Sequence, residues 1–317
     1  MENQKKKKLK RKLLITVSLV FLFMNTIAIF HAYKLTHFAS ADSEKTKSSN
    51  QLSASEKVKT ILFGVTNPKP VNTKLPSQKF ETIFLKSNKL IECWSIKTDN
   101  PKGTVVLFHG YNGNKSSLLD KSDEFLKLGY NTFLVDFMGS GNSEGNQTTI
   151  GFKEAEEVKT AYDYLKQNTS EDIFLFGTSM GAVAIMKAEN DYSLNPKGII
   201  IECPFGTMYQ TTAKRFSNMN VPAFPMAHLL LFWGGTQNGF WAFGHEPVEY
   251  AKKIDCPTLL LYGEKDNRVS RAEIDTIFSN LSGEKELKTY PKAGHENYLK
   301  KYKEEWISDV SSFLEKN

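Results

Sequence analysis

The pattern of hydrophobic and polar positions along this chain changes near residue 60. Before that point, residues 13–30 form one uncharged stretch, LLITVSLVFLFMNTIAIF, which only small polar side chains interrupt. These 18 residues are close to the length that a helix needs to cross the hydrocarbon core of a membrane. After that point, short β-rich runs alternate with amphipathic segments. The pattern predicts a membrane-entering helix followed by a folded domain.

The folded part is predicted to contain a mostly parallel sheet. Residues 81–85 and 90–96 have the pattern of an antiparallel pair, and 104–108 (TVVLF) is a continuous apolar run typical of a strand buried on both faces. Further strands are expected at 131–135, 173–176, 198–201, 258–261 and 287–290, with helices near 115–128, 152–165, after 179, at 271–281 and up to about 314. This alternation implies an α/β fold with helices on both faces of the sheet.

One stretch, residues 204–247, breaks the alternation. It is rich in methionine and aromatic residues, and its apolar run is too short and too interrupted by proline and glycine to cross a membrane. We expect a cap inserted over one edge of the sheet. The resulting division is a basic cytoplasmic tail at 1–12, a transmembrane anchor at 13–32, a linker at 33–60 and a domain at 61–317 with the cap at about 204–247.

The net charge of +6 comes from the N-terminal tail. The first twelve residues hold seven basic side chains and one acidic one, so the rest of the chain is neutral. A nucleic-acid partner is therefore not expected, because it would need basic residues clustered on the folded domain. Basic residues before an apolar segment instead put the N-terminus in the cytoplasm and the catalytic domain outside. The alternative is a secreted protein cleaved after Ala39-Ser40-Ala41.

The chain has three cysteines, Cys93, Cys203 and Cys256. They are too few, and odd in number, for a disulfide framework, and small buried residues are the simpler interpretation. No CxxC pair and no His/Cys group with metal-ligand spacing is present in the sequence. Neither a metal nor a cofactor is expected.

The strongest chemical signal is the sequence GTSMG at 177–181, which follows an apolar strand and opens a helical run. This is the context of a nucleophile elbow, in which Ser179 sits on a sharp strand-to-helix turn. Gly177 and Gly181 are needed there because a side chain two residues before or after the serine would clash.

A serine hydroxyl needs a base, and the base needs an acid that orients it. His295 follows the last expected strand, and Asp266 follows the strand before it. Both positions fall where loops converge above the elbow. Glu202 and Glu264 are the alternative acids.

The oxyanion hole requires two backbone N–H donors. Met180, directly after the nucleophile, is one candidate. Tyr111, in the sequence HGYNG after the strand at 104–108, is the other.

These motifs, HG at 109–110, GTSMG at 177–181, GEKD ending at Asp266 and GH at 294–295, stand in the order found in the α/β-hydrolase superfamily. Residues 75–317 resemble its serine aminopeptidase-like and monoacylglycerol lipase-like branch, and uncharacterised exported bacterial hydrolases of that kind. The resemblance implies the fold and the triad roles of Ser179, Asp266 and His295. It departs at Met138, where many relatives have arginine.

The sequence therefore predicts a serine hydrolase that cleaves a carboxylic ester through an acyl-enzyme. A serine peptidase or aminopeptidase, or an acyltransferase, is the alternative from the same chemistry. A non-catalytic binding protein would be expected to have lost a triad member, and all three are present. The aromatic cap favours a small-molecule or lipid-like acyl substrate, or else only packs on the sheet. The oligomeric state does not follow from the sequence.

Overall fold

The computed structural model describes residues 2–47, 51–218 and 220–317. Small parts of the predicted tail, linker and cap, at Met1, residues 48–50 and Met219, lie outside the described residues.

In the described part of the chain, eight strands form one mixed sheet in the order β1-β2-β4-β3-β5-β6-β7-β8. β1 and β2 pair antiparallel, β2 pairs antiparallel with β4, and β3 to β8 run parallel. The strands are β1 (Phe80–Lys86), β2 (Leu90–Ile96), β3 (Thr104–Phe108), β4 (Asn131–Val135), β5 (Ile173–Thr178), β6 (Gly198–Glu202), β7 (Thr258–Gly263) and β8 (Lys285–Tyr290). The predicted antiparallel pair and parallel sheet are confirmed.

Helices cover both faces because the central strands are apolar on both sides. In β3, Val105 and Leu107 point into one core and Val106 and Phe108 into the other, and all four are fully buried. One face is covered by α3 (Leu119–Lys127), after a short 3₁₀ turn at Lys115–Leu118, and by α10 (Tyr298–Lys301) and α11 (Lys303–Lys316). The other is covered by α4 (Glu154–Asn168), α5 (Met180–Tyr192), α8 (Pro247–Tyr250), the 3₁₀ turn Ala251–Lys253 and α9 (Arg271–Asn280).

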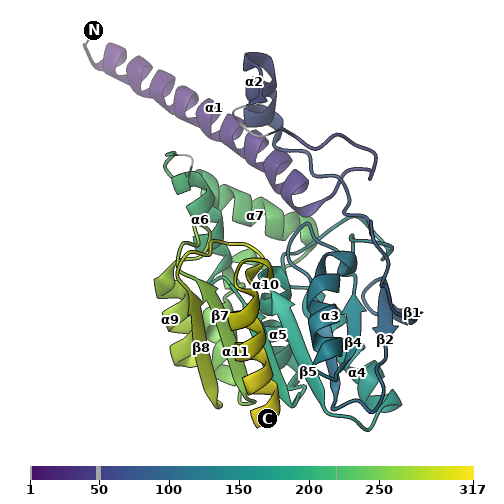
Figure 1. The fold of residues 1–317 in the computed structure, drawn as a ribbon. Coiled ribbons are helices and arrows are strands. Elements are labelled where there is room, and N and C mark those ends of the chain that lie inside the picture. The colour runs from purple at the N-terminus through teal and green to yellow at the C-terminus, as the bar shows by residue number, and fades with distance from the viewer. Residues whose placement is uncertain (1, 48–50, 219) are drawn as a thin grey trace.

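The segment between β6 and β7 forms the predicted cap. It contains α6 (Met208–Asn218), α7 (Met226–Asn238) and the 3₁₀ turn Ala242–Gly244. In Figure 1 these helices lie between the sheet and the N-terminal helix.

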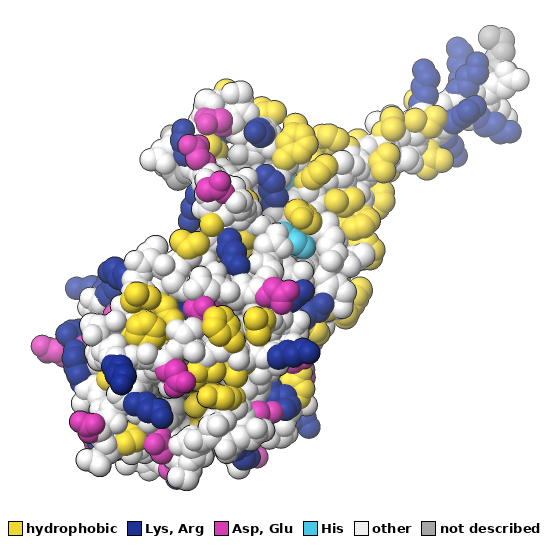
Figure 2. Space-filling view, turned by 90° about the vertical axis from the view of Figure 1, so that its right-hand side faces the viewer, with side chains coloured by type: hydrophobic (Ala, Val, Ile, Leu, Met, Phe, Trp, Pro, Cys, Tyr) yellow, Lys and Arg dark blue, Asp and Glu magenta, His cyan; other side chains and the backbone are white. Residues whose placement is uncertain are grey.

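The N-terminal helix α1 (Glu2–Thr36) includes both the basic tail and the apolar stretch. Among the described residues it is the one helix long and apolar enough to cross a membrane. Its last turns pack against α7, where Ala28, Ala32 and Leu230 are buried together, and the rest projects away from the body. Figure 2 shows hydrophobic side chains along the projecting helix and Lys and Arg side chains at its far end.

The segment expected to be a solvated linker has more structure than its composition suggests. Ser53 caps helix α2 (Ala54–Phe63) in a capping box with Glu56, a local signal that apolar periodicity does not detect. Earlier in the segment, Phe38 is buried and its neighbours pair with the domain at Gln147 and Pro68. The exact division of the chain stays a prediction.

Candidate active site

The turn between β5 and α5 holds Ser179 in a strained conformation, with φ at 53° and ψ at −108°. The turn is tight on both sides of the serine. A Cβ atom on Gly177 would lie 2.6 Å from the Ala182 nitrogen, and one on Gly181 would lie 2.3 Å from the Phe108 carbonyl oxygen. Glycine is therefore required at both positions, as expected of a nucleophile elbow.

The carboxyl ends of three parallel strands bring Ser179, His295 and Asp266 together. His295 Nε2 lies 3.0 Å from Ser179 Oγ, and His295 Nδ1 lies 2.7 Å from Asp266 Oδ2. The Asp266 side chain is fully buried, while the His295 side chain keeps 12% of its area exposed. A hydroxyl, an imidazole and a carboxylate thus form one continuous hydrogen-bonded chain.

Asp266 is fixed by its own loop. Its Oδ1 atom accepts hydrogen bonds from the backbone N–H groups of Arg268 at 2.7 Å and Val269 at 3.0 Å. Because these bonds hold one oxygen, the other stays aimed at His295 Nδ1. The imidazole then carries its proton on Nδ1 and presents Nε2 as the acceptor for the serine hydroxyl.

Two opposing effects act on the pKa of His295. Burial lowers it, while the nearby Cys203 sulfur and the Asp266 carboxylate raise it, and the net shift of the His295 pKa is upward. A protonated His295 side chain would therefore be stabilised at this position.

The two alternative acids have other partners. Glu202 is fully buried and accepts hydrogen bonds from Lys121 Nζ, Thr178 Oγ1 and Trp306 Nε1, all at 2.8 to 2.9 Å. Glu264 accepts a bond from the Thr289 hydroxyl. No hydrogen bond joins His295 to either carboxylate in the described residues, so the contacts favour Asp266.

The HGYNG loop lies directly against the elbow. A Cβ atom on Gly110 would be 3.7 Å from Ser179 Cβ, and Tyr111 and Met180 line the same cavity as Ser179. The N–H of Met180 is at the first position of α5, where a helix leaves its backbone donors without an intrahelical partner. The side chain of Tyr111 points elsewhere, because its hydroxyl donates to the Leu35 carbonyl oxygen.

Cys203 is a neighbour of the site that sequence reasoning missed. Its sulfur lies 4.0 Å from His295 Nε2, and its backbone has φ at 42°. The sequence did place Cys203 directly after the strand at 198–202. Because the carboxyl ends of parallel strands lie side by side, that position could have indicated that Cys203 is near Ser179. Like Cys93 and Cys256, it is buried and unpaired, as expected.

Ligand atoms of Cys203, Asp266 and His295 lie within 4.8 Å of one another. In the described ranges this is the one group of three side chains close enough to hold a metal ion. Two of these atoms, Asp266 Oδ2 and His295 Nδ1, already form a hydrogen bond with each other. The expectation that no metal takes part stays a prediction.

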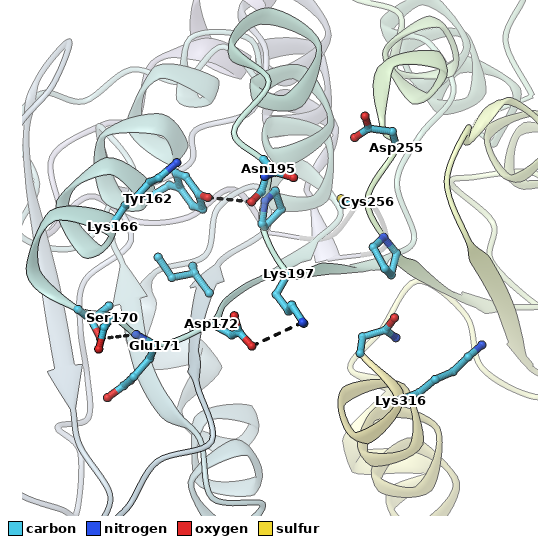
Figure 3. A pocket seen from close by; sticks show the side chains of 15 residues that line it. Tyr162, Lys166, Ser170, Glu171, Asp172, Asn195, Lys197, Asp255, Cys256 and Lys316 are labelled. Atoms are coloured by element: carbon cyan, nitrogen blue, oxygen red, sulfur yellow. Dashed lines mark hydrogen bonds and ion pairs between the residues drawn. The ribbon is translucent and has the colours of Figure 1, made fainter.

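Two large cavities lie on the molecule. One, of about 540 Å³, is lined by Ser179, His295, Tyr111 and Met180, with Leu35 contributed by the end of α1. The other, of about 770 Å³, lies at the amino ends of the central strands, away from Ser179. Tyr162, Asp172, Lys197 and Lys316 are among its lining residues (Figure 3). None of the proposed site residues lines the larger cavity, so its size does not make it the reaction site.

The chain is similar to known hydrolases in sequence and in fold. Residues 99–231 match the family described as serine aminopeptidase, S33, a range that contains the elbow but not Asp266 or His295. A carboxylesterase of Bacillus subtilis is 25% identical over 229 residues, covering 67% of this chain and 92% of its own. An uncharacterised Bacillus subtilis protein is also 25% identical, covering 71% of this chain and 75% of its own. An esterase structure from Pyrococcus furiosus superposes with a TM-score of 0.66 at 24% identity, covering 78% of this chain and 96% of its own.

The mixed sheet, the elbow at the end of β5 and the cap after β6 are those of the α/β-hydrolase fold. The match to the family described as serine aminopeptidase, S33, covers less than half of the chain and marks a resemblance to that family.

Proposed function

We propose that the chain is a serine hydrolase that cleaves a carboxylic ester, with Ser179 as nucleophile, His295 as base and Asp266 as the acid that orients the base. The observation that carries the proposal is the hydrogen-bonded chain from Ser179 Oγ through His295 to Asp266. Because each hydrogen bond is at most 3.0 Å long, proton transfer needs little rearrangement.

In the proposed reaction, His295 Nε2 takes the proton of Ser179 as the serine oxygen attacks the ester carbonyl. The backbone N–H groups of Tyr111 and Met180 donate to the resulting oxyanion. His295 then gives the proton to the leaving alcohol, and an acyl-enzyme remains on Ser179. In the second half, His295 takes a proton from water as the water oxygen attacks the acyl-enzyme. It then returns the proton to Ser179, and the carboxylic acid is released.

A hydrophobic acyl group is favoured by the surroundings of the site. Apolar side chains of Leu35, Ile150 and Phe205 line the cavity beside Ser179, so a hydrophobic acyl group would be removed from water there. A carboxylesterase is among the relatives. Peptide hydrolysis is the second candidate, because the matching family is described by an aminopeptidase activity.

A fluorophosphonate probe tests the proposed nucleophile. We expect the wild-type protein to be labelled at Ser179 and Ser179→Ala not to be labelled. A matched control is Ser193→Ala, at the far end of helix α5, which should keep full labelling. An unlabelled wild-type protein, folded by circular dichroism, would instead favour a non-catalytic binding protein.

Substrate panels separate the two candidate activities. We expect para-nitrophenyl esters to be hydrolysed at least about a hundredfold faster, in kcat/KM, than amino-acyl anilides of similar size, because such esters have the better leaving group. A preference for the anilides would assign the protein to the peptidases.

We further propose that α1 stays on the mature protein as a single-pass anchor with the catalytic domain outside the cell. Trp233 Nε1 donates to Asn25 Oδ1 and Gln237 Nε2 donates to the Ile29 carbonyl oxygen, both at 3.0 Å, so the cap contacts the apolar helix. Cleavage after Ala41 would remove these contacts. The basic residues at the start of α1 favour a cytoplasmic N-terminus.

A further inference from the structure

The cavity above Ser179 has a strongly one-sided charge. Four basic side chains line it, and they come from three separate parts of the chain: Lys45 after α1, Lys214 and Arg215 on α6, and Arg268 in the loop that holds Asp266. Among the described residues that line it there is no aspartate or glutamate. Since the chain after the tail is neutral overall, this excess of positive charge is local to the site.

The four cations have no carboxylate partner in the described residues, where no ion pair involves any of them. Lys45, Arg215 and Arg268 are exposed and Lys214 is half-buried, unlike the buried lysines Lys121 and Lys115, which are paired with Glu202 and Glu92. The nearest acid in sequence to Arg268 is Asp266, and the oxygens of that carboxylate are already bonded to His295 and to the loop backbone. The positive charge at the mouth of the cavity is therefore available to a ligand.

The Arg215 side chain has an aromatic contact although it has no carboxylate partner among the described residues. The Arg215 guanidinium lies over the Tyr111 ring, with its Cζ atom 5.8 Å from the ring centroid. The Asn218 side chain donates to the Asn267 carbonyl oxygen at 2.9 Å, which ties α6 to the Arg268 loop. Arg215 and Arg268 both line the cavity and are exposed to solvent, so two like charges face the same space and repel each other. An anion between them would relieve that repulsion.

An apolar space adjoins the charged one. A small cavity of about 50 Å³ lies beneath the cap and shares Leu35 and Ile150 with the site cavity, and its other lining includes Ala32, Leu230 and Leu231. A substrate that fills both spaces would have an apolar chain on one side of its ester and a charged group on the other.

We propose that the substrate is an amphiphilic ester whose acyl chain enters the apolar space under the cap and whose alcohol part carries an anionic group, a phosphate or a carboxylate, bound by Arg215 and Arg268. Lys45 and Lys214 add to the positive potential. The proposal rests on the proposed esterase function, and it adds the chemical class of the leaving group.

The test compares neutral and anionic esters with the same acyl chain, using the full-length protein in detergent micelles. One pair is soluble: para-nitrophenyl hexanoate and its ring-carboxylated analogue. The other pair is lipid: oleoyl glycerol and oleoyl lysophosphatidylglycerol. We expect the anionic member to have the higher kcat/KM in at least one pair, and the pair that responds identifies the source of the anion. Equal rates within both pairs would overturn the proposal.

Variants locate the effect. In Arg215→Gln and in Arg268→Gln, the ratio of kcat/KM for the anionic ester to that for the neutral ester should fall by about tenfold, the usual effect of losing one charge-assisted hydrogen bond. The control is Lys253→Gln, an exposed cation before β7 at the opposite edge of the sheet, which should leave the ratio unchanged. A ratio that stays the same in both arginine variants would contradict the proposal.

A further measurement distinguishes failure of the esterase proposal from failure of the anion-binding proposal. If the wild-type protein hydrolyses none of these esters, binding of dodecyl phosphate and of dodecanol to Ser179→Ala can be compared by calorimetry. Tighter binding of the phosphate, lost in Arg215→Gln, would support the anion subsite without any catalysis. Equal affinity for dodecyl phosphate and dodecanol would contradict the proposed anion subsite.

Discussion

Asp266 is the residue whose surroundings explain most about the site. Its loop backbone fixes one oxygen and His295 takes the other, so the carboxylate has no freedom to turn away. The sequence favoured Asp266 over Glu202 and Glu264, two other acids near strand ends, but it could not show which carboxylate reaches the base. The hydrogen bonds that separate it from Glu202 and Glu264 depend on loop geometry and on partners more than a hundred residues away, such as Trp306, which no local pattern contains.

The upward shift of the His295 pKa gives a prediction for the pH dependence of the reaction. The base acts only when neutral, so kcat/KM should fall as the pH drops through the pKa of His295, and the midpoint should lie above the ordinary histidine value of about 6.5. In Asp266→Asn one of the two groups that raise this pKa, the carboxylate, is gone. The midpoint should move to lower pH, and kcat should fall roughly ten-thousandfold.

Steady-state rates of nitrophenyl ester hydrolysis between about pH 5 and 10 would measure both effects. Glu264→Gln, an exposed carboxylate in the same loop, is the matched control and should keep the wild-type profile. An acid limb that is identical in Asp266→Asn and wild type would mean that another group controls the base.

Glu157 is a second buried carboxylate, and it lies beside Met138. Glu157 accepts a hydrogen bond from the Met138 N–H at 2.9 Å, but its Oε1 atom is buried without a hydrogen-bond partner among the described residues. No ion pair joins Glu157 to a cation within the described ranges. Burial, and the charge of Glu154, raise the pKa of Glu157 well above its ordinary value.

This raised pKa predicts how stability changes with pH. Above the unfolded-state pKa of about 4.5, unfolding releases a proton from Glu157, so its contribution to the free energy of unfolding falls as the pH rises toward the folded-state pKa. Glu157→Gln keeps the acceptor for Met138 and has no proton to lose. We expect its Tm to exceed the wild-type Tm by several degrees at about pH 8, and the difference to vanish near pH 4.

Differential scanning calorimetry across this pH range would measure the effect. Glu156→Gln, the exposed neighbour on the same helix, should follow the wild-type curve at every pH. A Glu157→Gln variant that is less stable than wild type at the alkaline end of the range would show that Glu157 is charged and satisfied in the folded protein.

At the scale of helices and strands, the sequence predicted the sheet well because each strand is labelled by its own residues. The expected runs lie within the observed strands and differ at most by two residues at an end, as for β7, which continues through Tyr262 and Gly263. Continuous apolar runs such as TVVLF are buried on both faces, so hydrophobicity alone marks them. The capping box at Ser270 likewise marks the start of α9 in the local sequence.

The sequence located the cap, but it did not predict how the helices of the cap pack. Its helices α6 and α7 are separated by residues that include Pro222 and Pro225, and the partner of α7 is α1, about 200 residues earlier in the chain. That pairing depends on small side chains: Ala28 and Ala32 are buried, and a Cβ atom on Gly234 would lie 4.0 Å from Ala32 Cβ. Close approach of two helices through alanine and glycine is a tertiary property that neither segment reveals alone.

At the scale of the whole molecule, the N-terminal segment is continuous with the hydrolase domain. The Thr148 N–H donates to the Thr36 carbonyl oxygen, the Tyr111 hydroxyl donates to that of Leu35, and Phe38 is buried. A protein that begins at residue 42 would lose these contacts and expose the face of α7 around Leu230. We expect its Tm to be lower by about 5 °C or more, because apolar surface returns to water.

The measurement is thermal unfolding in the same detergent for the full chain and for the truncated chain. A chain that lacks residues 2–12 is the control, since this basic tail lies on the projecting part of α1, away from the domain, and it should unfold at the full-chain Tm. An unchanged Tm on truncation at residue 42 would mean that the apolar helix and the hydrolase domain are independent, and would favour cleavage near Ala41.

Because Thr36 is hydrogen-bonded directly to the domain, no flexible linker separates the end of α1 from the part of the chain that holds Ser179. If the helix crosses the bilayer as proposed, the catalytic domain is held at a fixed distance from the membrane and in a fixed orientation. It could then reach only bonds that lie within a thin layer at the membrane surface, and molecules that diffuse freely farther out would have to come to it.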